Sequence, residues 1–150
     1  MKKIIVINGP NLNKLGEREP DIYGQKRLVD IENNCQKLSL KLDIQVKFFQ
    51  SNSESEIVEY IQNSVKKYDG MIINAAALTH TSISIHDSLK LLKIPIIEVH
   101  LSNPFQREEF RRKSYISPVA TAILSGFGPD VYKIAIQGLV SLLEEKNEKD

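Results

Sequence analysis

The sequence predicts an α/β fold in which a doubly wound, five-stranded parallel sheet has helices on both faces. The 150-residue chain alternates short apolar runs, rich in β-branched residues, with segments whose apolar residues recur at helical spacing. The apolar runs are nearly continuous, as in strands that are buried on both faces of a sheet. Strands that alternate with helices form βαβ units, and these units build parallel sheets with right-handed crossovers.

The length and composition fit one domain, residues 1–150. The chain is 41% hydrophobic and 26% charged, which is ordinary for a globular protein with one core. Its net charge of +1, without any basic block, predicts neither a nucleic-acid partner nor a membrane partner. No apolar stretch approaches the ~20 residues that span a bilayer. The apolar part of "MKKIIVING" is too short for a signal peptide, and the single cysteine suits a reducing cytoplasm, so we expect a cytoplasmic protein.

Five strands are expected, one for each short apolar run. The runs are Ile4–Ile7, Ile44–Phe49, Met71–Ile73, Ile94–Val99 and Val119–Leu124. With helices between them, these strands predict a flavodoxin-like architecture.

Helical spacing between the strands predicts four helices and a short fifth one. The four have apolar faces within residues 28–42, 57–65, 85–92 and 131–143. Cys35 lies on the first of these faces, so we expect it in the core. Ser53 and Glu56 form a capping-box signal at the start of the second helix. The short helix is expected near Phe105–Lys113, and the charged end "EEKNEKD" is expected to fray.

Polar residues gather directly after three of the predicted strands. The segments are "NGPNLN" at 8–13, "NAAALTHTS" at 74–82 and "EVHLSNPF" at 98–105. Ligands of open parallel sheets bind outside the carboxyl ends of the strands. We therefore expect Asn11, Asn74, His80 and His100 to meet at one edge of the sheet.

Glu98 and His100 stand two positions apart on a predicted strand and should point to the same face. A carboxylate there can hold one imidazole nitrogen and orient the other for acid–base chemistry. A partly buried histidine in a structural salt bridge is the alternative interpretation. Together with His80 and His86, His100 shows no zinc-binding spacing, and we expect His86 on a helix away from this edge.

Several enzyme classes lack their signatures in this sequence. There is no G-x-G-x-x-G after the first strand, no glycine–lysine phosphate loop and no G-x-S-x-G elbow. These absences argue against dinucleotide binding, nucleotide phosphoryl transfer and serine hydrolysis. Metal-free acid–base chemistry on a polar small molecule remains.

Five motifs, in order along essentially the whole chain, resemble type II 3-dehydroquinate dehydratases. They are "GPNLN" at 9–13, "GEREPDIYG" at 16–24, "NAAALTHTS" at 74–82, "EVHLSNPFQREEFRRKSY" at 98–115 and "SGFGPDVY" at 125–132. One departure is visible, because the family commonly has Asn-Pro where this chain has Asn74-Ala75.

The resemblance implies a hydro-lyase that acts as a single catalytic domain over residues 1–150. Such an enzyme eliminates water from 3-dehydroquinate through an enolate and gives 3-dehydroshikimate. This reaction is the third step of the shikimate pathway, which leads to chorismate and the aromatic amino acids. The resemblance implies neither a metal nor an organic cofactor.

The resemblance also implies catalytic roles for five residues. Tyr23, on a lid formed by "GEREPDIYG", would be the proton acceptor. Arg18 on the same lid would favour the phenolate, and Asn11 would help to hold the enolate through a water molecule. His100, oriented by Glu98, would be the proton donor to the departing hydroxyl group.

Further positions resemble the family's contacts to substrate. Asn74 and the backbone amides of Leu101 and Ser102 would bind the substrate carboxylate. His80 and Arg111 would bind the ring hydroxyls.

Asp87 resembles a residue that the family contributes to the neighbouring subunit's site. This implies a homo-oligomer, typically a dodecamer built as a tetramer of trimers. Arg107 matches a further basic position of the family, and a solvated surface role is an equal alternative for it. Without the resemblance, Arg107, Arg111 and Arg112 would be interpreted as one exposed face of a short charged helix.

Two other functions stay open at this level. A Schiff-base dehydratase or aldolase-like enzyme would need a buried reactive lysine, and the lysines here lie on polar helix sides or near the termini. A flavodoxin-like binding or signalling module would need an acidic cluster or a phosphate-binding loop after the first strand, where this chain has Asn8-Gly9-Pro10-Asn11.

Overall fold

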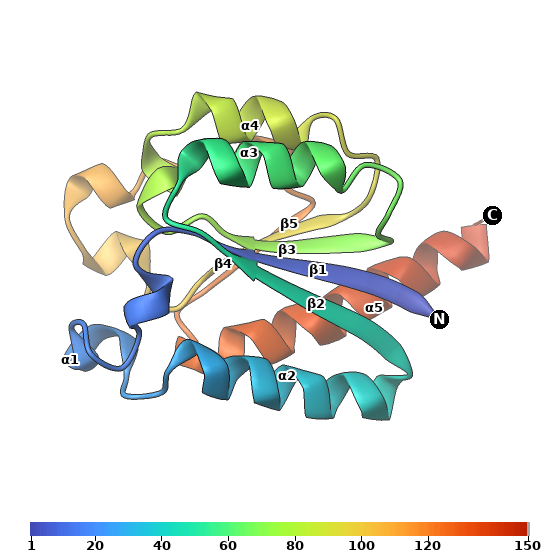
Figure 1. The fold of residues 1–150 in the computed structure, drawn as a ribbon, viewed down its shortest axis with the longest axis horizontal. Coiled ribbons are helices and arrows are strands. Elements are labelled where there is room, and N and C mark those ends of the chain that lie inside the picture. Colours follow the sequence, from blue (N-terminus) through green and yellow to red (C-terminus); the bar gives the residue numbers. More distant parts are fainter. Residues whose placement is uncertain (150) are drawn as a thin grey trace.

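A parallel sheet of five strands, in the order β2-β1-β3-β4-β5, forms the centre of the structure, a computed structural model that describes residues 1–149 (Figure 1). The strands are β1 (Lys2–Asn8), β2 (Ile44–Gln50), β3 (Gly70–Asn74), β4 (Ile96–His100) and β5 (Ala122–Ser125). This order confirms the predicted doubly wound, flavodoxin-like sheet. β5 begins later than predicted because Pro118 belongs to a 3₁₀ turn, Ser117–Val119, that occupies the start of the apolar run.

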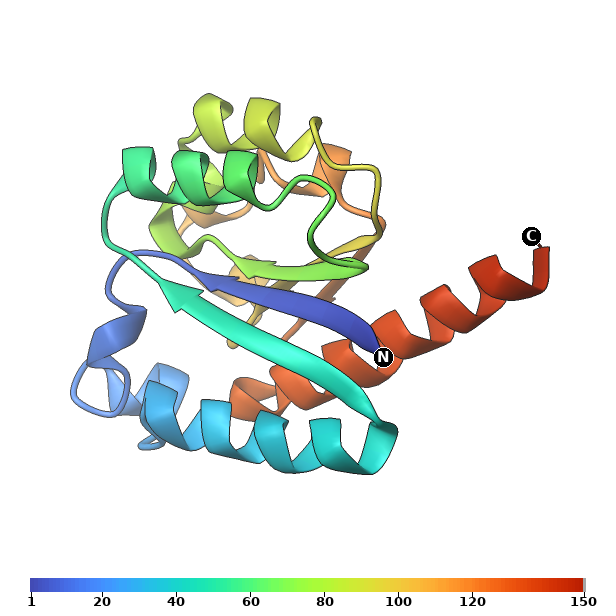
Figure 2. The same cartoon turned by 45° about the vertical axis from the view of Figure 1, so that its right-hand side comes forward.

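Two helices cover each face of the sheet (Figures 1 and 2). They are α2 (Leu28–Leu42) and α5 (Val131–Lys149) on one face, and α3 (Glu54–Asn63) and α4 (Ile83–Leu89) on the other. Successive side chains of a strand point to opposite faces. In β1, Ile4 and Val6 therefore pack toward α2 and α5, whereas Ile5 and Ile7 pack toward α3 and α4. All four side chains are fully buried, as the continuous apolar run predicts.

The helix signals are confirmed in most respects. Cys35 is fully buried in the core between α2, α5 and the sheet. The Ser53 hydroxyl accepts the backbone N–H of Glu56 at 3.3 Å and caps α3. The return half of the capping box is absent, because the Glu56 carboxylate instead accepts the Ser51 hydroxyl at 2.7 Å.

The predicted short helix near Phe105–Lys113 is wrong. The chain forms two 3₁₀ turns there, η3 (Pro104–Gln106) and η4 (Glu109–Arg111). Phe105 and Phe110 remain 69% and 63% exposed. A short helix is stable only when an apolar face packs against the core, and these two aromatic side chains are not buried there.

The end of the chain also differs from expectation. α5 continues through the charged residues to Lys149, where the Lys149 ammonium lies 3.1 Å from the Glu145 carboxylate one helical turn earlier. Asp150, the last residue of the segment expected to fray, lies outside the described residues. Within residues 1–149, no helix has the length and apolar character that crossing a membrane requires.

Candidate active site

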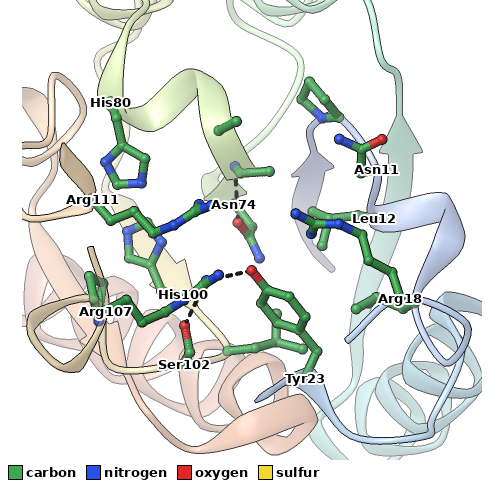
Figure 3. A pocket seen from close by; sticks show the side chains of 16 residues that line it. Asn11, Leu12, Arg18, Tyr23, Asn74, His80, His100, Ser102, Arg107 and Arg111 are labelled. Carbon is green, nitrogen blue, oxygen red and sulfur yellow. Dashed lines mark hydrogen bonds between the residues drawn. The ribbon is translucent and has the colours of Figure 1, made fainter. Parts of the chain in front are cut away.

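A pocket opens at the carboxyl ends of β1, β3 and β4 (Figure 3). It lies at the topological switch point of the sheet, between β1 and β3, where the strand order reverses. It brings together nine of the eleven site residues predicted from the sequence: Asn11, Arg18, Tyr23, Asn74, His80, His100, Leu101, Ser102 and Arg111. Of the other two, Glu98 is buried beneath His100, and Asp87 is exposed on α4 and does not line this pocket.

A close backbone approach shapes the loop after β1. A side chain on Gly9 would place its Cβ atom 2.4 Å from the carbonyl oxygen of Ala75, so this position requires glycine. The Gly9 N–H donates to the Asn74 carbonyl at 2.8 Å and ties the two loops together. Asn11 follows in the left-handed region with φ of 70°, and its N–H donates to the Asn52 side chain at 2.9 Å. These contacts set Asn11 at the pocket wall.

Asn74 ends β3 with both ends of its carboxamide engaged. Its Oδ1 accepts the backbone N–H of Ala76 at 3.1 Å, and its Nδ2 donates to the hydroxyl of Tyr132 at 3.1 Å. Ala75 has φ of −75°, which lies in the range of proline, so the departure from Asn-Pro leaves the backbone path open to either residue.

His80 ends the 3₁₀ turn η2 (Ala76–His80) and faces the pocket (Figure 3). Its Nδ1 lies 2.7 Å from the carbonyl oxygen of Lys113. A carbonyl only accepts, so Nδ1 carries the proton and Nε2 is left as the free nitrogen. Burial is the main cause that lowers the pKa of His80. Its ring lies 6.4 Å from the His100 ring, centroid to centroid.

Glu98 and His100 form the pair that the strand spacing predicts. The Oε2 atom of Glu98 lies 2.6 Å from His100 Nε2 and accepts the Ser114 hydroxyl at 2.8 Å. Its Oε1 atom accepts the Ser117 hydroxyl. Burial raises the pKa of Glu98, but the hydrogen bonds from His100, Ser117 and Ser114 outweigh burial, and the net pKa is lowered. Glu98 is therefore a buried carboxylate whose two oxygens both accept hydrogen bonds.

The segment 16–24 folds over the pocket as a lid. Its end glycines, Gly16 and Gly24, have φ of 90° and 83°, and between them lies the short helix α1 (Pro20–Tyr23). The guanidinium carbon of Arg18 lies 5.4 Å from the centroid of the Tyr23 ring. Positive φ at both ends lets the chain turn sharply over the strand ends.

Arg107 is the cation in direct contact with the Tyr23 hydroxyl. Its guanidinium donates to the Tyr23 oxygen (Figure 3) and lies 5.0 Å from the ring centroid. It also lies 3.8 Å from the Glu19 carboxylate. Only 10% of the Arg107 side chain is exposed, so the alternative of a solvated surface role is wrong.

Arg111 also lines the pocket, whereas Arg112 does not. The local sequence carries no signal for this division, because a spacing of four marks one face only in an α-helix, and this segment forms two 3₁₀ turns. Ser114, Ser117 and Tyr132 support Glu98 and Asn74. Ser114 and Tyr132 lie within the family motifs at 98–115 and 125–132, but neither residue was predicted as part of the site, and Ser117 lies outside both motifs.

The described part of the chain places no lysine in the lining of this pocket, so the Schiff-base alternative lacks its nucleophile there. Within residues 1–149, no group of three or more His, Cys, Asp and Glu side chains is arranged to hold a metal ion.

Comparison with known proteins identifies related sequences over nearly the full length. The profile of the family Dehydroquinase class II matches residues 2–140. The chain is 51% identical over 147 residues to the 3-dehydroquinate dehydratase of Prochlorococcus marinus (strain MIT 9215), covering 98% of this chain and 100% of that protein. It is 52% identical over 143 residues to the 3-dehydroquinate dehydratase of Endomicrobium trichonymphae, covering 95% and 100%.

Solved structures agree with this pattern. The type II dehydroquinase from Butyrivibrio crossotus DSM 2876 superposes with a TM-score of 0.90 at 42% identity, covering 92% of this chain and 97% of that one. The type II dehydroquinase from Propionibacterium acnes superposes with a TM-score of 0.91 at 38% identity, covering 94% and 97%.

Proposed function

Because the chain belongs to the class II dehydroquinase family, we propose that its pocket eliminates water from 3-dehydroquinate and releases 3-dehydroshikimate. The enzyme is then a hydro-lyase of the shikimate pathway. The observation that carries the proposal is a pocket with a phenol on one side, held by Arg107, and a carboxylate-supported imidazole on the other. Elimination needs these two functions, a base and an acid.

Tyr23 is the base in this mechanism and takes the proton beside the substrate ketone. A neutral phenol is a poor base, so the tyrosine must act as phenolate. Arg107 supports the phenolate because it donates to the oxygen that carries the charge. Arg18 adds a second positive charge near the ring. The lid thus brings the base over the substrate together with its counter-charge.

His100 is the acid, and it protonates the hydroxyl group that leaves. Glu98 holds the Nε2 side of the ring, which leaves Nδ1 as the nitrogen available for proton transfer in the pocket. The buried carboxylate also stabilises the imidazolium form. Asn11 helps to hold the enolate oxygen between the two proton transfers, through an ordered water.

The remaining pocket residues hold the substrate. Asn74 and the backbone amides of Leu101 and Ser102 bind its carboxylate, and His80 and Arg111 bind its ring hydroxyls. All five line the same pocket, which supports this assignment.

Residues 1–150 act as one catalytic domain in the cytoplasm, and the enzyme assembles as a dodecamer, a tetramer of trimers. Asp87 reaches the site of a neighbouring subunit in this assembly. Its exposure on α4, away from the pocket of its own chain, supports that role. Sedimentation of the purified protein tests the assembly.

The direct test of function mixes purified protein with 3-dehydroquinate in EDTA and follows the ultraviolet absorbance of the conjugated enone product. We expect absorbance to grow in proportion to enzyme. Absence of any signal would remove the assignment. Borohydride added during turnover should leave the protein mass unchanged, since a covalent gain would instead indicate a Schiff base.

A further inference from the structure

A buried tyrosine connects the floor of the pocket to the end of β1. Tyr132, in the first turn of α5, is 0% exposed. Its hydroxyl donates to Asn8 Oδ1 at 2.6 Å and accepts from Asn74 Nδ2 at 3.1 Å. The three residues come from β1, β3 and α5, and of the three Asn74 is the one that lines the pocket. In Figure 3, Asn74 lies between the two histidines and Asn11.

The hydrogen bonds determine which atom of the Asn74 carboxamide is the oxygen and which is the nitrogen. The backbone N–H of Ala76 can only donate, so the atom that it contacts at 3.1 Å must be the Asn74 oxygen. The other atom is then the amide nitrogen, which carries two hydrogens. One hydrogen binds Tyr132, and the second is available to a ligand in the pocket.

The direction of the Tyr132 hydroxyl follows from the same reasoning. With Asn8 Oδ1 as its acceptor, the hydroxyl keeps a lone pair for the N–H of Asn74. In this arrangement Asn8 Nδ2 is the one buried polar atom of the three side chains that has no hydrogen-bond partner. If the Asn8 amide were reversed, both the hydroxyl hydrogen and Asn8 Oδ1 would lack partners, which costs more. Burial raises the pKa of Tyr132, so the hydroxyl keeps its proton.

We propose that Tyr132, with Asn8 behind it, is a positioning residue that makes Asn74 present an N–H donor to the pocket and thereby selects a carboxylate on the substrate. This inference rests on the proposed function. A carboxylate offers only acceptors, so it needs donors around it. Without the Tyr132 hydroxyl, the amide nitrogen of Asn74 loses its anchor, and of these two hydrogen bonds only the one from the Ala76 N–H still holds the carboxamide in place.

The test is Tyr132→Phe, which removes only the hydroxyl. We expect KM for 3-dehydroquinate to rise about three- to tenfold, the effect of one lost hydrogen bond, while kcat stays within about twofold. Competitive inhibition by 3-dehydroshikimate and by its carboxamide gives a second readout. The preference for the carboxylate should fall by the same factor, whereas loosened packing alone would weaken both inhibitors equally.

Tyr60→Phe is the matched control, because it removes a phenolic hydroxyl from α3 and leaves a ring stacked on Phe49. It should change neither KM nor the inhibitor preference. If Tyr132→Phe does not fold, Asn8→Leu removes the acceptor of the hydroxyl instead, and the inhibitor preference must fall there.

The outcomes separate the two proposals. A wild-type protein without dehydratase activity overturns the proposed function. An active wild type whose Tyr132→Phe variant keeps both KM and the inhibitor preference overturns the role of Tyr132 alone.

Discussion

The Nε2 atom of His100 lies 2.6 Å from the Oε2 atom of Glu98, a carboxylate that is only 1% exposed. Two serine hydroxyls donate to the same carboxylate, Ser114 to Oε2 and Ser117 to Oε1. A buried negative charge is stable only while its hydrogen-bond donors remain. The charge of Glu98 and the ring orientation of His100 therefore depend on each other.

Glu98→Gln should lower kcat by about 10²- to 10⁴-fold, the usual contribution of a positioned general acid, because an amide no longer supports the imidazolium. Steady-state kinetics measures the effect, and circular dichroism checks the fold. Glu109→Gln, an exposed carboxylate of the neighbouring segment, should keep full activity. Near-normal turnover in Glu98→Gln would contradict the role of the pair.

Arg107→Ala should lower kcat by about 10²- to 10³-fold, comparable to the loss of one donor at a developing charge. The reason is its contact with the Tyr23 oxygen. Tyr23→Phe and Arg18→Ala should likewise reduce kcat by orders of magnitude with little change in the urea midpoint. Arg112→Ala removes a cation that does not line the pocket and should leave kcat unchanged. Equal losses in Arg107→Ala and Arg112→Ala would point to general electrostatics instead.

The free energy of unfolding should fall in acid in two stages. The pKa of His80 is lowered from its ordinary value of 6.5, chiefly by burial, so the unfolded chain takes up this proton first and stability declines as pH drops below about 6.5. The pKa of Glu98 is lowered from 4.5, because its hydrogen bonds outweigh burial, and the same sign gives a second decline below about 4.5.

Urea denaturation at a series of pH values measures both declines. Glu98→Gln should weaken the lower one and keep the upper one. A stability that rises as pH falls from 7 to 5 would contradict the sign for His80.

Cys35 should be unreactive in the folded protein. Burial is the main cause that raises the pKa of its thiol to about 12, and its side chain is 0% exposed. The thiolate is the reactive form, so labelling requires opening of the core. Ellman's reagent at pH 8 should give no rapid reaction in buffer and one thiol per chain in urea. Rapid labelling of the native protein would show that the core opens readily.

Ala75→Pro should stabilise the protein by about 0.4–1 kcal/mol through the unfolded state. Ala75 already has φ of −75°, which suits proline. The preceding residue, Asn74, ends strand β3, and the extended backbone of a strand is the conformation that a residue before proline prefers. Ala76→Pro is the opposing control, because Ala76 has φ of 54°, which proline cannot adopt. Urea midpoints compare the two, and a lower midpoint for Ala75→Pro would show that its backbone N–H is needed.

The sequence by itself determined the sheet, its covering helices and the edge that carries the site. These features follow from local periods: continuous apolar runs make buried strands, and a spacing of two puts Glu98 and His100 on one face. The parallel order then gathers the loops after β1, β3 and β4 at one edge. The family motifs added the lid and selected Arg111.

Only the tertiary structure decided which groups contact one another inside the site. The bond between Arg107 and Tyr23 joins residues 84 positions apart, and those of Tyr132 to Asn74 and Asn8 span 58 and 124 positions. No local period encodes such pairs, because they depend on how the lid and α5 pack onto the strand ends. The turns over 104–111 escaped prediction for the related reason that their aromatic side chains find no core to face.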